Sequence, residues 1–163
     1  MNDLHWRDQP RPEDAAAIRV LAAVSGAFSA AETELAVELL EERLGRGLAA
    51  SGYHFLFAEP APSGTALGYA CYGPIPLTRA SWDLYWIVVA RAAWRGGIGR
   101  RLLAEVERRA ALAGAGALYV DTSGRPDYAA TRDFYAACGY RTAATLPDFY
   151  ALGDAKVIFV KRL

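Results

Sequence analysis

The chain has 163 residues, of which 53% are hydrophobic, and its 18 basic residues balance its 18 acidic residues. This length and apolar content suit one α/β domain with a substantial core and exclude a disordered chain. A net charge of zero argues against nucleic acid and against an anionic membrane as partners, because proteins that bind them usually carry a basic excess. We therefore expect one domain, residues 1–163, that acts on a small or weakly charged partner.

The cysteine and histidine residues indicate neither disulfides nor a metal site. Cys71 and Cys138 are too few for a disulfide framework, and we interpret them as ordinary buried or half-buried thiols. His5 and His54 are not spaced with them as ligands, so we expect no metal. The N-terminus lacks the apolar core of a signal peptide, and no apolar run approaches the ~20 residues that span a bilayer. We expect a cytoplasmic protein.

The first part of the chain predicts a short strand and two helices. Leu4–Arg7 is the strand. Residues 12–14, Pro-Glu-Asp, are typical of the first turn of a helix, where proline's missing N–H costs nothing and acidic groups meet the positive end of the dipole. The second helix begins at Ser29 with Ser-Ala-Ala-Glu, which has the form of a capping box. Gly45 and Gly47 favour its end.

Three strands and a helix follow. Tyr53–Glu59 and Ala66–Tyr72 flank residues 61–65, whose proline and glycine predict a hairpin loop. Trp82–Ala90 is aromatic and β-branched almost throughout, which predicts a central strand covered on both faces. A glycine-rich turn leads from this strand to residues 98–113, where apolar residues recur at helical spacing.

The last part of the chain predicts a strand, a helix and two closing strands. Ala117–Thr122 is the strand and Tyr128–Cys138 the helix. The closing strands are Tyr140–Thr145 and Ala155–Arg162, with a longer loop over residues 146–154 between them. The element order, β-α-α-β-β-β-α-β-α-β-β, predicts an α/β (α+β) fold, a mixed sheet with helices on both faces.

The glycine-rich turn carries the clearest chemical signal. Residues 89–100 read Val-Ala-Arg-Ala-Ala-Trp-Arg-Gly-Gly-Ile-Gly-Arg. Unpaired N–H groups and the dipole at a helix N-terminus attract anions, and glycines let the backbone approach phosphate oxygens. Arg95 and Arg100 can add positive charge. Neither a Rossmann fingerprint nor a Walker A motif is present, and a tight turn without any ligand is the alternative.

Within this turn, residues 94–99 (Trp-Arg-Gly-Gly-Ile-Gly) resemble the acetyl-CoA signature of the GNAT family of N-acetyltransferases, Q/R-x-x-G-x-G/A. Trp94 stands where the family has Gln or Arg. The resemblance implies a mostly antiparallel seven-stranded sheet, splayed at its central strands. It also implies that the turn binds the pyrophosphate of acetyl-CoA and that the strand before it pairs with the pantetheine arm. The cofactor-binding residues are then Ile87, Val88, Val89, Arg95, Gly96, Gly97, Ile98, Gly99, Arg100 and Thr131.

A second motif, residues 131–140 (Thr-Arg-Asp-Phe-Tyr-Ala-Ala-Cys-Gly-Tyr), resembles the family's A-x-x-F-Y-x-x-x-G-F helix. Tyr135 matches the tyrosine that lies near the CoA sulfur, so the resemblance implies that Tyr135 protonates the departing thiolate. A phenol with an unperturbed pKa of about 10 can donate that proton. Phe134 is interpreted as a helix residue packed on the sheet. Tyr128 stands where the family has an asparagine.

A carboxylate should accept a proton from the attacking amine, directly or through water, because only a neutral amine is nucleophilic. Asp83 is the first candidate, since related enzymes often carry an acidic residue facing the substrate at the start of this strand. A solvated acid at the strand end is the alternative for Asp83. Asp121, at the end of the next strand, is the second candidate.

The resemblance places the acceptor between the first two helices and the loop that joins the last two strands. Phe28 from the helix junction, with Phe149 and Tyr150 from the loop, are therefore the candidate substrate-binding residues. Exposed aromatic rings are costly unless they line a pocket. Packing of Phe149 and Tyr150 back onto the sheet is the alternative.

Together the motifs predict an enzyme that moves an acetyl group from acetyl-CoA, as a co-substrate, to a primary amine of a small molecule or a peptide by direct attack. A non-catalytic acyl-CoA sensor of the same fold is one alternative, which Trp94 favours. A nucleotide-binding α/β protein that uses the same turn for other phosphates is another. The sequence leaves open the identity of the amine and the oligomeric state, including a homodimer.

Overall fold

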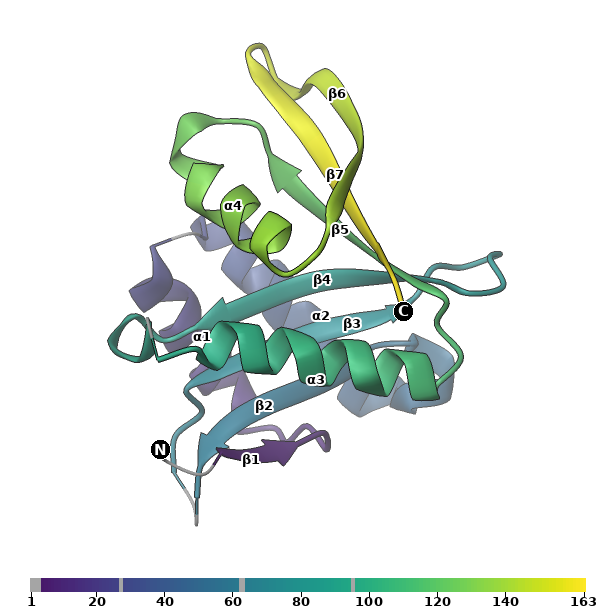
Figure 1. Ribbon diagram of the computed structural model, residues 1–163. Coiled ribbons are helices and arrows are strands. Elements are labelled where there is room, and N and C mark those ends of the chain that lie inside the picture. Colours follow the sequence, from purple (N-terminus) through teal and green to yellow (C-terminus); the bar gives the residue numbers. More distant parts are fainter. Residues whose placement is uncertain (1–3, 27, 62–63, 95) are drawn as a thin grey trace. The chain divides into compact units, whose positions relative to one another are not determined.

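The computed structural model describes residues 4–26, 28–61, 64–94 and 96–163 (Figure 1). The chain forms two compact units, Met1–Gly73 with Trp86–Val106 and Pro74–Tyr85 with Glu107–Leu163. Within the described residues the strand order is β1-β2-β3-β4-β5-β7-β6. The pair β4–β5 is parallel, whereas β1–β2, β2–β3, β5–β7 and β6–β7 are antiparallel. The predicted fold class, a mixed and mostly antiparallel seven-stranded sheet with helices, is confirmed.

The first unit surrounds the strand β2 with helices. All four residues from Phe55 to Ala58 are buried, so both faces of β2 are covered. In Figure 1, α3 crosses in front of β2 and β3, and the fainter α1 and α2 lie behind them. This unit contains β1 (Leu4–Arg7), α1 (Asp14–Ser25), α2 (Ala30–Ser51), β2 (His54–Pro60), most of β3 (Gly68–Pro74), the end of β4 (Ser81–Val89) and the beginning of α3 (Ile98–Leu112).

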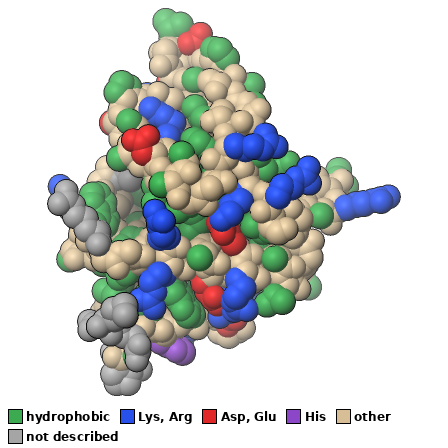
Figure 2. Space-filling model, viewed as in Figure 1, with side chains coloured by type: hydrophobic (Ala, Val, Ile, Leu, Met, Phe, Trp, Pro, Cys, Tyr) green, Lys and Arg blue, Asp and Glu red, His purple; other side chains and the backbone are tan. Residues whose placement is uncertain are grey.

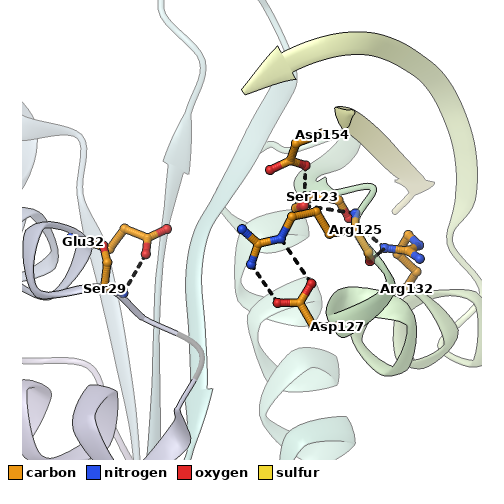
Figure 3. Close-up of polar contacts among 7 residues, drawn as sticks. All are labelled: Ser29, Glu32, Ser123, Arg125, Asp127, Arg132 and Asp154. Atoms are coloured by element: carbon orange, nitrogen blue, oxygen red, sulfur yellow. Dashed lines mark hydrogen bonds and ion pairs between the residues drawn. The ribbon is translucent and has the colours of Figure 1, made fainter. Parts of the chain in front are cut away.

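Helix α2 begins as predicted and ends later than predicted. The Ser29 hydroxyl accepts from the Glu32 backbone N–H at 3.2 Å and the Glu32 carboxylate accepts from the Ser29 N–H at 2.7 Å, which is a capping box (Figure 3). Gly47 interrupts the helix, with φ 78° and ψ 171°, but helical geometry resumes after it and ends at Gly52. The Ser51 hydroxyl donates to the Gly47 carbonyl at 2.8 Å, within the helical turn that follows the interruption. The predicted end at Gly45 and Gly47 was therefore wrong.

The second unit places α4 on one face of its strands. The Leu118, Val120 and Thr122 side chains alternate along β5 and are buried. Tyr135 of α4 lies against Phe159 of β7, with ring centroids 5.8 Å apart. This unit contains the beginning of β4, the end of α3, β5 (Ala117–Ser123), α4 (Ala129–Ala137), β6 (Arg141–Ala151) and β7 (Asp154–Arg162).

The predicted loop over residues 146–154 was wrong, because β6 extends to Ala151 and only two residues turn the chain into β7. Leu146 pairs with Lys156 and Ala151 pairs with Asp154, so the residues between them form a bulge. Asp148 adopts a positive φ of 54° within this bulge. Part of the segment predicted as a loop is therefore an irregularity inside a strand.

Two sequence predictions involve residues that lie outside the described part of the chain. The predicted hairpin loop over residues 61–65 includes residues 62–63, which lie outside the described residues, as does Arg95. No helix in the described part of the chain is both long and apolar enough to cross a bilayer. Among these same residues, no three His, Cys, Asp or Glu side chains gather in a group that could hold a metal ion.

Candidate active site

The glycine turn joins β4 to α3 through a short 3-10 helix, Arg91–Ala93. The Gly97 carbonyl accepts from the Arg101 N–H at 3.1 Å, so Gly97 directly precedes the first helical residue, Ile98. Gly97 has φ 73°, a conformation that favours glycine. The N–H groups of residues 98–100 belong to the first helical turn, where no carbonyl of the helix can accept from them. These amides are therefore suited to an anion.

The positive charge at this turn comes from side chains as well as from the helix. Arg91 and Arg100 are both exposed, and Arg100 lies in the first turn of α3. Over α3 as a whole, basic and acidic side chains are interspersed (Figure 2). The charge that suits a phosphate is thus local to the helix N-terminus and does not extend as a basic surface along the helix.

Trp94, which departs from the family motif, ties the turn to the end of β4. Its indole N–H donates to the Val89 carbonyl at 2.9 Å. The Arg91 guanidinium lies 5.6 Å from the centroid of the indole ring, within the range of a cation–π contact. The next residue, Ala90, is also held in place, because its N–H donates to the Leu67 carbonyl at 2.8 Å. The sequence alone assigned Trp94 no structural role.

The strand that leads into the turn lies close to β3. A Cβ on Gly68 would come within 2.7 Å of the Val88 carbonyl oxygen, so only glycine allows this approach. Val88 is buried, whereas Ile87 and Val89 are half-buried. The segment predicted to bind pantetheine is therefore a packed strand. Its close approach to Gly68 of β3 fixes its position.

Tyr135 is buried in α4, with 4% of its surface exposed. Its ring makes edge contacts with Phe134 at 5.4 Å and Tyr140 at 5.5 Å, and the half-buried Phe134 is its helix neighbour. Burial raises the pKa of Tyr135 above the ordinary value for tyrosine, since the charged phenolate is disfavoured. The phenol therefore stays protonated at neutral pH and can act as a donor.

Arg132, which the sequence analysis did not single out, holds the turn between β5 and α4. Its guanidinium donates to the carbonyl oxygens of Ser123 at 2.7 Å and Arg125 at 2.8 Å (Figure 3). The Arg125 N–H in turn donates to the Ser123 hydroxyl at 3.1 Å. Thr131, a predicted cofactor-binding residue, is exposed beside Arg132 at the beginning of α4. The only sequence signal for Arg132 is its place within the second motif.

Asp83 has the environment of a general base. It is half-buried in β4 and pairs with Tyr119 of the parallel strand β5. Burial, and to a lesser degree the negative charge of Asp121, raise the pKa of Asp83 to about 6, while Lys156 lowers it. A carboxylate with this pKa is mostly ionised at neutral pH and binds a proton more readily than an ordinary aspartate.

Asp121, the second candidate, has a different environment. Its carboxylate lies 2.5 Å from the Lys156 ammonium group, and its side chain is 43% exposed. Asp121 is therefore more exposed than the half-buried Asp83 and is already paired with a cation. Asp83 is therefore the better proton acceptor of the two.

The candidate acceptor-binding aromatics lie in different units. In the first unit, Phe28 lies against Trp86, with centroids 4.9 Å apart and planes tilted by 44°. The indole nitrogen of Trp86 is buried, and no hydrogen-bond partner for it occurs among the described residues. In the second unit, Phe149 and Tyr150 are 53% and 49% exposed and contact each other edge to face at 5.1 Å. The sequence did not indicate Trp86 as a site residue, because its contact with Phe28 joins positions that are far apart in the chain.

Known proteins resemble this chain in sequence and in fold. The model of the acetyltransferase (GNAT) family matches residues 17–140. A GNAT-family protein from Desulfovibrio desulfuricans has a similar solved structure, with 42% identity, a TM-score of 0.93, and coverage of 98% of this chain and 99% of that chain. Ribosomal-protein-alanine N-acetyltransferase from Brucella melitensis is similar at 25% identity, with a TM-score of 0.74 and coverage of 98% and 100%.

A Salmonella typhimurium protein solved with its cofactor acetyl-CoA shares the fold at 20% identity, with a TM-score of 0.73 and coverage of 99% of this chain and 94% of that chain. No protein of curated function matches this chain in sequence. The family match spans both the glycine turn and the Tyr135 helix. The chain belongs to the GNAT family of acetyltransferases.

Proposed function

We propose that this protein transfers an acetyl group from acetyl-CoA to a primary amine of a small molecule or a peptide. The observation that carries the proposal is the glycine turn, where Gly97 leaves the first amides of α3 open to an anion. The similar proteins named for their substrates acetylate amines, as in ribosomal-protein-alanine N-acetyltransferase and in aminoglycoside 6'-N-acetyltransferase from Enterococcus faecium. The Salmonella protein supports acetyl-CoA as the donor.

In this proposal the glycine turn binds the pyrophosphate of acetyl-CoA. Backbone amides of residues 96–100 donate to the phosphate oxygens, and Arg95 and Arg100 add positive charge. Ile87, Val88 and Val89 align the pantetheine arm with their backbone, and Thr131 contributes at the start of α4. These interactions orient the thioester before the chemical step, which lowers the entropic part of the barrier.

The chemical step is a direct transfer between amine and thioester. Asp83 accepts a proton from the amine, directly or through water, and the amine nitrogen bonds to the carbonyl carbon. The N–H of Val89 or a neighbouring residue stabilises the negative charge that develops on the carbonyl oxygen. The carbon–sulfur bond then breaks, and Tyr135 donates its proton to the departing thiolate. The products are the acetylated amine and CoA.

The acceptor is proposed to contact aromatic side chains. The Phe28 ring packs against Trp86. The side chains of Phe149 and Tyr150 are each about half exposed to solvent. Aromatic rings of this kind bind the apolar part of a ligand, or a cation above the ring face. An amine that combines a charged nitrogen with an apolar portion suits this set of side chains.

The test is a panel of amines incubated with acetyl-CoA, with release of free thiol as the readout and calorimetry for CoA binding. We expect thiol release that depends on one class of amine and calorimetric binding of CoA. CoA binding without thiol release for any amine would indicate the non-catalytic sensor. Binding of ATP or NAD in preference to CoA would indicate the nucleotide-binding alternative.

A further inference from the structure

The strand pairing of the second unit gathers three charged side chains on one face. Asp83 is the partner of Tyr119, and Asp121 follows Tyr119 by two residues along β5. Ser123, two residues further, pairs with Lys156 of β7. Because side chains alternate between the faces of a sheet, Asp83, Asp121 and Lys156 share one face. The other face of β5 carries the buried residues under α4.

The charges on this face do not cancel. Two carboxylates, Asp83 and Asp121, are served by one ammonium group, and Lys156 pairs directly with Asp121 at 2.5 Å. That hydrogen bond raises the pKa of Lys156, so its side chain remains a cation throughout the neutral range. Lys156 is only 20% exposed, which limits screening of its charge by water.

Lys156 is also held in place by its neighbours. Its ammonium group lies 4.8 Å from the centroid of the Phe149 ring, in the β6 bulge. The other titratable side chains near these groups include Tyr85, which lies two residues from Asp83 on the same face of β4, and also Tyr119, Tyr128, Tyr150 and Asp154. Asp154 accepts from the Ser123 hydroxyl at 2.5 Å. Among the groups described in this unit, Asp121 and Lys156 are those whose charges act on Asp83.

We propose that Lys156 is a positioning residue for acetyl transfer: it neutralises Asp121 and so leaves Asp83 as the carboxylate that accepts the proton of the amine. The inference rests on the proposed function and extends it to a residue that acts through Asp121 and Asp83. Without the cation, the charge of Asp121 acts on Asp83 uncompensated, and the two carboxylates titrate as a coupled pair. Asp83 then holds its proton to a higher pH and is a base over a narrower range.

The experiment compares Lys156→Met with the wild-type protein, by kcat/KM over about pH 5 to 9 and by carbon-13 NMR titration of the Asp83 carboxyl. The rising limb of the pH profile should move upward by about one pH unit, which is about a tenfold loss on the acid side and little loss on the alkaline side. The pKa of Asp83 measured by NMR should rise together with the rising limb of the profile. Lys156→Arg keeps the cation and should restore the wild-type profile.

Lys161→Met is the matched control. Lys161 also lies in β7 and pairs with a carboxylate, Glu107, at 2.7 Å, but its strand partner is Leu118, on the opposite face. Its loss should leave the rising limb in place. The proposal is overturned if Lys156→Met lowers the rate equally at every pH, or if the Asp83 titration does not move. Failure of the proposed function is recognised separately, because the wild-type protein would then release no thiol from acetyl-CoA with any amine.

Discussion

Two charged clusters in this molecule contain similar groups and differ in how completely those groups are paired. In the first unit Arg7 faces two carboxylates, those of Asp14 and Glu59. In the second unit Lys156 faces Asp121 with Asp83 nearby. Both clusters therefore hold one cation and two anions.

The Arg7 cluster is saturated with hydrogen bonds. Its guanidinium donates to both Asp14 oxygens at 2.9 and 2.7 Å, to Glu59 at 2.8 Å and to the Gln9 carbonyl at 2.7 Å. Burial alone would lower the pKa of Arg7, but the hydrogen bonds to Asp14 and Glu59 raise it above the ordinary value. The carboxylates share a fork of donors, so both of them are hydrogen-bonded to the same cation.

In the Asp83 cluster one lysine, Lys156, lies near two carboxylates and forms its ion pair with Asp121. A lysine ammonium is a compact charge that serves one partner here, whereas an arginine fork serves two. Burial of the remaining carboxylate, Asp83, together with the smaller effect of the Asp121 charge, raises its pKa to about 6. The comparison teaches that complete pairing makes a charged cluster structural, and that an incomplete one provides a group able to exchange protons at neutral pH.

The largest effect should come from breaking the saturated cluster. Arg7→Met leaves the buried Asp14 and the half-buried Glu59 without their cation, and we expect a loss of about 3–5 kcal/mol in the free energy of unfolding, measured in urea. Arg19→Met removes an ion pair with Glu34 whose side chains are 47% and 58% exposed, so its loss should reduce the free energy of unfolding far less. Equal losses for the two variants would contradict the structural role of the Arg7 cluster.

Asp83→Asn should abolish most of the activity and spare the fold. Without the base, kcat/KM should fall by about 100-fold or more. Since the pKa of Asp83 is higher in the folded protein than in the unfolded chain, the carboxylate makes folding less favourable as the pH rises from about 4 to about 6. The neutral amide removes that cost, so the free energy of unfolding at pH 8 should not decrease. A destabilised variant would point to a structural role for Asp83.

Tyr135→Phe should lower kcat less than the loss of Asp83 does. A thiolate is a moderately good leaving group even without a proton, because thiols have a pKa of about 8.5, so we expect a loss of about 10- to 100-fold. The ring contacts with Phe134, Tyr140 and Phe159 survive the substitution. CoA binding, measured by calorimetry, should stay within about twofold. An unchanged kcat would remove Tyr135 from the mechanism.

The wild-type enzyme should lose activity on the acid side. Because Asp83 accepts a proton only when ionised, kcat/KM should decrease by about tenfold per pH unit below its pKa of about 6. The basic pKa of the acceptor amine affects the profile at higher pH, so a series of amines should move the alkaline region and leave the acid limb in place. An acid limb that follows the amine instead would exclude Asp83 as its origin.

The smallest effect concerns the glycine turn. Gly97→Ala forces a side chain into the positive φ of 73°, which should cost about 1 kcal/mol of stability. If the same conformation opens the amides to phosphate, CoA binding should weaken by a comparable free energy, about fivefold. Gly96→Ala is the comparison, since Gly96 is not among the glycines with positive φ. Identical thermal unfolding of the two variants would contradict the strain at residue 97.

Features that depend on neighbouring residues could be predicted from the sequence. The capping box at Ser29 and the strand-turn-helix around Gly97 are local patterns, and the structure contains both. The motifs around these elements were also sufficient to identify the family. Gly47 was visible in the sequence as a glycine, but the helical turn that follows it, up to Ser51, was not.

Features that depend on strand register could not be predicted. The β6 bulge requires Leu146 and Ala151 to pair with residues only two positions apart in β7, and no local pattern specifies this. The environment of Asp83 likewise depends on Asp121 and Lys156, which parallel and antiparallel pairing bring to the same face. The sequence could therefore nominate Asp83 as a base but not the residues that tune it.

The most direct test of the account is a crystal structure of the protein with CoA bound. The account predicts the pyrophosphate on the amides of residues 96–100, and the Tyr135 hydroxyl within hydrogen-bond distance of the CoA sulfur. A glycine turn without phosphate, or a phenol directed away from the sulfur, would contradict it.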